Sequence, residues 1–318
     1  MNNIFFTILF LFSIITFGQK KNLNEDLILF EKTVAIQELI NEELEKIINP
    51  KDTIDITNEE KIQRKFAVGL KENILNKLIR DYEQLINEFP KSSLIFRALN
   101  NKGFAELELK DYKKAKETFL KILKSEANDK EKGGIGSGIM GEPYANYKNR
   151  ACKTLADIEL KSNNYYEALN YLDETKKFPY AHFCGNEYAA DEIYMVLMYS
   201  KCYIGLNQYE KAFDILLPNI IENGLASNSK LITATLNALL KNYKKQELKT
   251  QFENCFKNVS VEKEKRNKNE YKSYYINFLG RKIHLDSWNS NNEMNEQERE
   301  KEYKRILAES EFYKLLID

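Results

Sequence analysis

One six-residue pattern, with a tyrosine at its third position and an alanine at its sixth, occurs three times along the chain. It reads KDYKKA at 110–115, NNYYEA at 163–168 and NQYEKA at 207–212. In each copy a turn-forming position precedes an aromatic residue, and an alanine follows three residues after that aromatic, between two stretches of helical periodicity. This arrangement is typical of the inner turn of a helical hairpin, and its recurrence predicts an array of stacked hairpins. Arrays of this kind usually bind other molecules through their extended surfaces.

Small residues occupy equivalent places in the three repeats. Gly103, Ala156 and Ser200 each lie twelve residues before the shared alanine, where a large side chain would force the two helices of a hairpin apart. The pattern resembles the tetratricopeptide repeat, and it covers about residues 59–258 when two degenerate units are included. The markers of these units are Phe66, Tyr82 and Leu85 in one, and Leu236, Leu248, Phe252 and Cys255 in the other. The resemblance implies an all-α superhelix of antiparallel helix hairpins.

Two stretches are longer than the repeat period allows. Tetratricopeptide repeats recur every ~34 residues, whereas roughly 19 and 10 extra residues separate the second repeat from its neighbours. These inserts lie at about 128–147 and 179–188, and the first contains five glycines between Gly133 and Gly141. Because long loops in compact domains are uncommon and often functional, both inserts are candidate binding elements.

Residues 1–19 have the features of a signal peptide. The chain is apolar from Ile4 to Phe17, which is too short a run to cross a bilayer comfortably but fits a signal-peptide core. Thr16 and Gly18 are small enough for cleavage before Gln19. The run has no preceding Lys or Arg, so a short uncleaved anchor is the alternative. We expect an exported protein, periplasmic, secreted or associated with the outer surface, without an integral membrane span after cleavage.

The rest of the chain divides into three parts. Residues 20–58 form an N-terminal helical segment, and Thr57 with Glu60 is a predicted capping box for the helix that follows. The repeats occupy 59–258. Residues 259–318 are expected to form a small C-terminal α+β cap. The cap comprises a charged connector at 262–268, a hairpin that turns at Gly280-Arg281 and a final helix.

The charge balance limits the classes of partner. Lys plus Arg and Asp plus Glu number 48 each, so nothing in the net charge favours nucleic acid or an anionic membrane surface. The predicted partner is therefore a protein or peptide.

The resemblance also implies where such a partner would bind, because the first helices of these repeats line a concave groove. Four of the groove positions are basic and one is acidic, which loosely resembles the carboxylate clamp of chaperone-binding family members. Such a groove would suit an acidic segment or a free C-terminus. The positions are Arg97, Asn100, Phe104, Arg150, Lys153, Asp157, Tyr194, Leu197 and Lys201.

Motifs that would carry chemistry are weak. The glycines at 136, 138 and 141 formally match a dinucleotide fingerprint, but a helical stretch rather than a strand precedes them. His182-Phe183-Cys184 lacks a recognised metal-ligand spacing, and neighbours in sequence seldom form a nucleophilic pair. We expect no cofactor and no metal. The cysteines are expected to be mainly buried thiols, with one disulfide through Cys184 as the alternative.

The sequence therefore predicts a non-catalytic scaffold that binds a protein or peptide. The alternative is an exported enzyme or small-ligand binder whose site is formed by the two inserts, with Gly136, Gly138, His182 and Asn186 as its residues. Convergence of the loops Gly133–Gly141 and His182–Asn186 on one cavity with inward polar groups would favour this alternative, whereas loops that lie apart and exposed would favour the scaffold. A carbohydrate-uptake subunit is disfavoured, because starch-binding proteins with such repeats are longer and usually begin with a lipidated cysteine.

Overall fold

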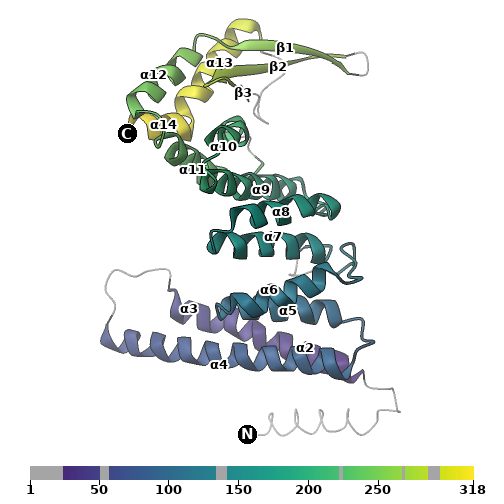
Figure 1. Cartoon of the computed structure of the whole chain (residues 1–318). Coiled ribbons are helices and arrows are strands. Elements are labelled where there is room, and N and C mark those ends of the chain that lie inside the picture. Colours follow the sequence, from purple (N-terminus) through teal and green to yellow (C-terminus); the bar gives the residue numbers. More distant parts are fainter. Residues whose placement is uncertain (1–23, 51–56, 134–141, 222–224, 267–268, 286–293) are drawn as a thin grey trace, which may run out of the picture. The chain divides into compact units, whose positions relative to one another are not determined.

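The computed structural model describes residues 24–50, 57–133, 142–221, 225–266, 269–285 and 294–318. The predicted signal peptide and the glycines at 136, 138 and 141 lie outside these residues. The chain divides into two compact units, Met1–Ile122 and Leu123–Asp318. The described residues form mainly helices, together with a three-stranded antiparallel sheet (Figure 1). The prediction of helices with a small sheet is confirmed at this level, whereas a continuous superhelix remains a prediction.

The N-terminal unit is entirely helical in its described part. A long helix, α4, packs along the preceding helices α2 and α3 and, on another side, against α5 (Figure 1). The predicted capping box starts α4: the Thr57 hydroxyl accepts a hydrogen bond from the amide of Glu60, and the Glu60 carboxylate accepts one from the amide of Thr57. The helical elements are α2 (Glu25–Leu39), the π-helical turn η1 (Ile40–Leu44), α3 (Glu45–Ile48), α4 (Asn58–Glu88), α5 (Ile95–Glu108) and α6 (Tyr112–Leu123).

The structure corrects the degenerate unit expected before Pro90. That stretch is one continuous helix, α4, and not a hairpin of its own. Tyr82 and Leu85 are fully buried against residues of α2 and η1, but Phe66 is 72% exposed. The helical segment before residue 50 therefore supplies the packing partner that the repeat pattern assigned to α4 itself.

Helices α5 and α6 form the first hairpin with the predicted close approach. Gly103 on α5 faces the fully buried ring of Phe119 on α6, and a Cβ atom at Gly103 would lie 2.8 Å from the nearest ring atom. Beside this contact, Lys102, Glu106 and Thr118 form a buried polar network. The Lys102 ammonium lies 2.5 Å from one Glu106 oxygen, and the Thr118 hydroxyl donates to the other at 2.7 Å. The buried carboxylate is thus both paired and hydrogen-bonded, as a buried charge must be.

The three repeated phrases adopt the same turn. Lys110, Asn163 and Asn207 have φ values of 61°, 58° and 57°, in the left-handed region. In each copy the next residue donates its amide to the carbonyl five residues before it, at 2.8–2.9 Å. This is the Schellman arrangement at a helix C-terminus, which satisfies carbonyls that the ended helix leaves free. The recurring sequence phrase therefore encodes a recurring backbone geometry.

The C-terminal unit continues the hairpins and ends in the sheet. Its hairpin helices pack in sequence, with α7 on α8, α8 on α9 and α9 on α10 (Figure 1). The shared alanines and Ala156 are fully buried, and Ser200 is 1% exposed. The helices are α7 (Tyr147–Lys161), α8 (Tyr165–Glu174), η2 (Thr175–Lys177), α9 (Gly185–Gly205), α10 (Tyr209–Leu216), η3 (Leu217–Asn219), α11 (Ser229–Leu239), α12 (Lys245–Cys255), α13 (Glu296–Glu309) and α14 (Glu311–Ile317).

The cap differs from its prediction in three places. Most of the expected charged connector is strand β1 (Ser260–Arg266), which pairs antiparallel with β2 (Asn269–Phe278). The hairpin to β3 (Arg281–His284) turns at Leu279 and Gly280, one residue before the predicted turn, and both have positive φ. Two positive φ values match the twist of the strands better than an ordinary turn. The expected final helix is two helices, because Ser310 leaves the helical conformation and caps α14.

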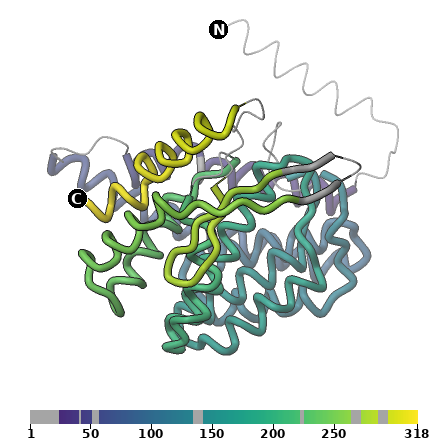
Figure 2. Tube along the Cα trace, turned by 90° about the horizontal axis from the view of Figure 1, so that it is seen from above, coloured from purple at the N-terminus to yellow at the C-terminus, as the bar shows by residue number. Residues whose placement is uncertain are grey.

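The cap shares one core with the last hairpins. Phe252 of α12 packs its ring against Phe278 of β2 and Phe312 of α14, with ring centroids 5.2 and 5.3 Å apart. Arg281 of β3 pairs with Glu210 and Asp214 of α10. Figure 2 shows the strands as a narrow ribbon with the last helices beside it. The sheet is thus held by the repeats, since a small hairpin would not be stable alone.

Candidate functional site

A polar cavity of about 280 Å³ lies in the C-terminal unit, where both inserts meet the helices α7 and α9. Two tyrosine rings and five charged side chains contribute to its walls. The lining residues are Glu142, Asn146, Asn149, Arg150, Lys153, Tyr180, Glu187, Ala190, Asp191 and Tyr194.

The first insert is anchored to the start of α7 by Asp129. Its two carboxylate oxygens accept hydrogen bonds from the amides of Lys148 and Asn149 at 2.7 and 3.0 Å. Asp129 thereby satisfies amides of the first helical turn and places a negative charge at the positive end of the helix dipole. The amide of Ala145 also donates to the carbonyl of Glu131 at 3.0 Å. These bonds hold the residues that precede the glycine-rich stretch against those that follow it and against the start of α7.

Asn146 ties the two inserts together. Its side-chain amide donates to the carbonyl of Ala181 at 3.0 Å, and its side-chain oxygen accepts from the amide of Ala181 at 2.9 Å. Asn149 adds a bond from its side chain to the carbonyl of Phe178 at 2.7 Å. Asn146 itself has a left-handed backbone with φ of 48°, a conformation that asparagine tolerates better than most residues. Residues next to the two predicted loops are therefore joined at Asn146. Of the loops themselves, 134–141 lies outside the described residues, so their convergence on one cavity stays a prediction.

The second insert is shorter than predicted, because α9 begins at Gly185. Asn186 is consequently an exposed helical residue outside the cavity lining, and His182 is 6% exposed and also outside it. The Nδ1 atom of His182 accepts the amide of Cys184 at 2.9 Å, and the imidazole stacks on Tyr180 and Phe183. These two predicted site residues thus serve the local fold, and the structure does not bring them to the cavity.

The two basic residues of the cavity are already paired. The Arg150 guanidinium lies 2.6 Å from the Glu142 carboxylate, and the Lys153 ammonium pairs with Asp191 across α7 and α9. Burial lowers the pKa of Lys153, and the Asp191 carboxylate opposes this shift. The Lys153 ammonium also lies 4.8 Å from the ring centroid of Tyr180 and 5.9 Å from that of Tyr194.

Burial shifts the pKa of Tyr180 and of Tyr194, the two tyrosines near the Lys153 ammonium. It raises the pKa of Tyr180 and of Tyr194 to about 12, and neighbouring carboxylates add to both shifts. Both phenols therefore stay protonated at physiological pH and offer hydrogen-bond donors as well as ring faces.

The structure places the predicted groove residues in different surroundings. Arg150, Lys153 and Tyr194 come together in the cavity, whereas Asp157 pairs with Lys161, Leu197 packs in the core, and Lys201 is exposed. Arg97, Asn100 and Phe104 belong to the N-terminal unit.

The prediction that Asn100 faces an open groove is wrong. It is 1% exposed, so its side chain does not face a groove, and Phe104 is half-buried with its ring packed edge-on against Phe119. The alignment placed them on the open face because it treated α5 as a helix with one packed side. In the structure α5 contacts α4 as well as α6.

Sequence reasoning missed seven of the ten lining residues in this role: Glu142, Asn146, Asn149, Tyr180, Glu187, Ala190 and Asp191. Glu142, Asn146, Tyr180 and Asp191 are brought to the cavity by the inserts and by the early turns of α9. The sequence signal that could have located Asp191 is the spacing of Glu187, Ala190, Asp191 and Tyr194, which repeats at helical intervals along one face of α9.

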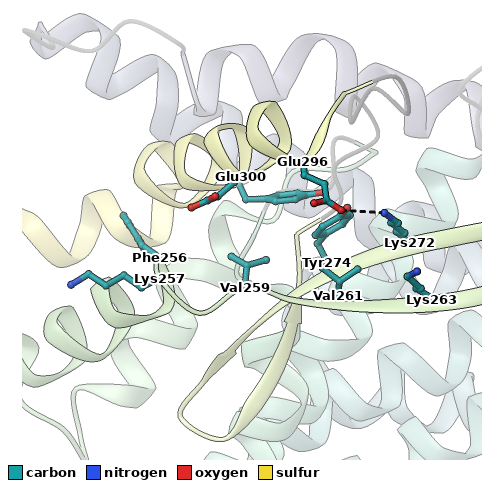
Figure 3. Close-up of a pocket in the computed structure, with 10 residues that line it drawn as sticks. Phe256, Lys257, Val259, Val261, Lys263, Lys272, Tyr274, Glu296 and Glu300 are labelled. Carbon is teal, nitrogen blue, oxygen red and sulfur yellow. Dashed lines mark ion pairs between the residues drawn. The ribbon is translucent and has the colours of Figure 1, made fainter.

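A second cavity, of about 400 Å³, lies between α13 and the ribbon of β1 and β2 (Figure 3). Its floor is apolar, with Val259, Val261 and Tyr274, and charged side chains stand at its rim. Lys272 and Glu296 form the ion pair marked in Figure 3, at 3.6 Å. This cavity is larger, but its charged groups are mostly exposed. The cavity at α7 and α9 has the greater concentration of half-buried polar groups, and we take it as the candidate site.

The thiols are poorly suited to nucleophilic chemistry. All four cysteines are free, and three of them are buried. Burial raises the pKa of Cys152 to about 12 and those of Cys202 and Cys255 to about 11. Within the described residues, no cluster of His, Cys, Asp and Glu has an arrangement that could hold a metal ion.

Comparison with known protein families gives no match, and comparison with curated protein sequences gives none either. The resemblance to tetratricopeptide repeats therefore remains a prediction from the sequence. Among the helices that the structure describes, none is both long and apolar enough to cross a bilayer.

Proposed function

We propose that this chain is an exported, non-catalytic binding protein and that the cavity between α7 and α9 receives a side chain of a protein or peptide partner. The single observation that supports this most is the open side of the cavity, where Ala190 is exposed and Tyr194 is 37% exposed. Asn146, which lines the cavity, exchanges two hydrogen bonds with Ala181 and so holds the two inserts together beside it. Inserts that are held together in this way build a defined surface on the repeats.

The size of the cavity favours a polypeptide. At about 280 Å³ it lies just below the range of roughly 300–1,000 Å³ that encloses drug-sized ligands. Its wall includes the exposed residue Ala190 and the ring of Tyr194, which is 37% exposed. A small cavity with an open side suits one side chain of a longer partner that also contacts neighbouring helices.

The chemistry of the candidate nucleophiles supports a non-catalytic role. The buried cysteines hold their protons at neutral pH, and a thiol must ionise to attack. His182 uses Nδ1 to accept the amide of Cys184, so this nitrogen is not free to activate a nucleophile. Four of the five charged side chains that line the cavity stand in ion pairs, which suits recognition better than proton transfer.

Export rests on the sequence of residues 1–19. N-terminal sequencing of the mature protein from the cell envelope should give Gln19 as the first residue. An intact N-terminus in the cytosolic fraction would contradict this part of the proposal.

Binding is best tested by site-specific photo-crosslinking in the native envelope. A photoreactive residue at position 194, on the cavity rim, should give a discrete protein adduct, whereas the same residue at position 166 should not. Tyr166 is a suitable control, since it is 69% exposed on α8 and lies outside the cavity lining. Adducts of equal yield from both positions, or none from position 194, would refute the assignment of this surface.

The second candidate function is a small-ligand binder that uses the same cavity. The bond pair between Asn146 and Ala181 favours it, because inserts that are held together beside a polar cavity can contact a small ligand. It predicts that a metabolite extract without protein raises the thermal midpoint of unfolding, and that Tyr180→Ala removes the increase.

A further inference from the structure

We infer that the cavity recognises a cationic group, a guanidinium or an ammonium, on its partner. This inference rests on the proposed function, and it specifies the chemistry of the partner. It differs from the acidic segment expected from the sequence. The difference arises because the carboxylates of Glu142 and Asp191 neutralise the two basic residues from which an acidic partner was expected.

The first observation is that an ammonium already occupies part of the cavity. Lys153 places its charge near the rings of Tyr180 and Tyr194, at 4.8 and 5.9 Å from their centroids, and pairs with Asp191. Aromatic faces attract cations through their quadrupole, and a carboxylate strengthens the attraction. The walls thus already form a binding site for a positive group, and the rest of the cavity lies beside it.

The second observation is that negative charge is in excess. The lining contains Glu142, Glu187 and Asp191 but only two basic side chains, Arg150 and Lys153. Both basic groups are neutralised, by Glu142 and Asp191 respectively. An incoming carboxylate would therefore have to break an ion pair before it could form one, and it would meet like charges.

Glu187 is the group that remains for a ligand. Its side chain is half-buried in the cavity wall, and it has no hydrogen bond or ion pair with any residue that the structure describes. It lies on the same face of α9 as Asp191 and Tyr194, one and two turns earlier, with the small residue Ala190 between them. A guanidinium that enters over Ala190 can bind Glu187 with two parallel hydrogen bonds and place its flat face near Tyr194.

The test uses agmatine as a guanidinium probe and glutarate as an anionic probe, both titrated by calorimetry against the full mature chain. Agmatine should bind with a dissociation constant on the order of 1 mM, and glutarate should not bind. Glu187→Gln should weaken agmatine binding roughly tenfold, by removal of a charged partner. Glu167→Gln on α8 is the matched control, and it should leave binding unchanged because Glu167 lies outside the lining.

Lys153→Met gives the sharpest discrimination. If the cavity binds cations, removal of the internal ammonium should strengthen agmatine binding roughly fivefold, because a competitor for the same rings is gone. If the cavity binds anions, the same variant should abolish glutarate binding. Circular dichroism should verify that this variant folds. Tyr194→Leu, which leaves the ion pair intact, is the second variant and should weaken agmatine binding about threefold.

The outcomes separate this inference from the proposed function. Glutarate binding without agmatine binding, or agmatine binding unaffected by Glu187→Gln and Tyr194→Leu, would overturn the inference. If position 194 still crosslinks a protein in that case, the proposed function stands alone. Agmatine binding that depends on Glu187, with no protein adduct at position 194, would support the cation site and contradict the scaffold.

Discussion

Replacement of Gly103 by alanine tests whether the hairpins require small residues where their helices approach. The added methyl group would lie 2.8 and 2.9 Å from two atoms of the Phe119 ring, well inside the 3.5–4.0 Å at which carbon atoms attract. Phe119 is fully buried, and its ring is packed edge-on against Phe104. It therefore has little room to move, and overpacking of this kind costs about 1–3 kcal/mol.

A second glycine separates this steric cost from helix propensity. Alanine is favoured over glycine within a helix by about 0.8–1.0 kcal/mol, so Gly103→Ala should lose about 0–2 kcal/mol of stability overall. Gly69 lies in α4, and an added Cβ atom there would meet nothing within 4 Å. Gly69→Ala should therefore stabilise the same unit, by about 0.5–1 kcal/mol. The difference between the two variants isolates the steric term.

Hydrogen exchange measured by mass spectrometry is the suitable assay, because it reports the opening free energy of α4, α5 and α6 segment by segment. Amides of α5 and α6 should exchange faster in Gly103→Ala than in Gly69→Ala, by a factor of about 5 to 140, which corresponds to the steric term of about 1–3 kcal/mol. Equal protection in the two variants would show that the helices tolerate a methyl group at this crossing. The steric reasoning from the small residues would then be wrong.

Three further perturbations test other features. Lys110→Gly should raise the unfolding midpoint in urea, because the native φ of 61° is unfavourable for lysine by roughly 1 kcal/mol, and an unchanged or lower midpoint would contradict the strain. Asn146→Ala should lose about 1–3 kcal/mol through its two bonds to Ala181, and exchange at the Ala181 amide should accelerate; unaltered exchange would show that the inserts are joined by other contacts. The unfolding free energy should fall as pH rises above about 9, where the thiols of an unfolded chain ionise but those of Cys152 and Cys202 stay protonated, since burial raises their pKa to about 12 and 11. A serine variant at Cys152 should show a shallower decline, and an identical pH dependence would contradict the assignment.

The parts of the fold that are locally encoded could be predicted from the sequence. The turns at Lys110, Asn163 and Asn207 and the capping box at Thr57 each depend on a few neighbouring residues, and the structure has them as expected. Strand β1 could not be predicted in this way. It alternates Glu and Lys without an apolar face, and it becomes a strand only by pairing with β2.

In the candidate site too, some residues could be predicted from the sequence and others depend on long-range contacts. Arg150, Lys153 and Tyr194 are predicted through the resemblance to tetratricopeptide repeats, which implies that the first helices line a groove. Glu142, the partner of Arg150, could not be assigned, since the approach of the inserts depends on a long-range bond pair between Asn146 and Ala181. Asp191 could have been assigned, because it shares a face of α9 with Tyr194. The charge of the cavity therefore could not be deduced from the basic residues alone.

The contacts of the sheet with α10 and α12 have a consequence for self-association. A stack of hairpins exposes an apolar end onto which another copy could add, and repetition of that contact would produce a filament. In the C-terminal unit, the rings of Phe278 and Phe312 cover Phe252, and Arg281 fastens β3 to α10. The three strands thus cover the last hairpin of this unit, and their removal should expose an apolar surface through which copies of the chain associate end to end.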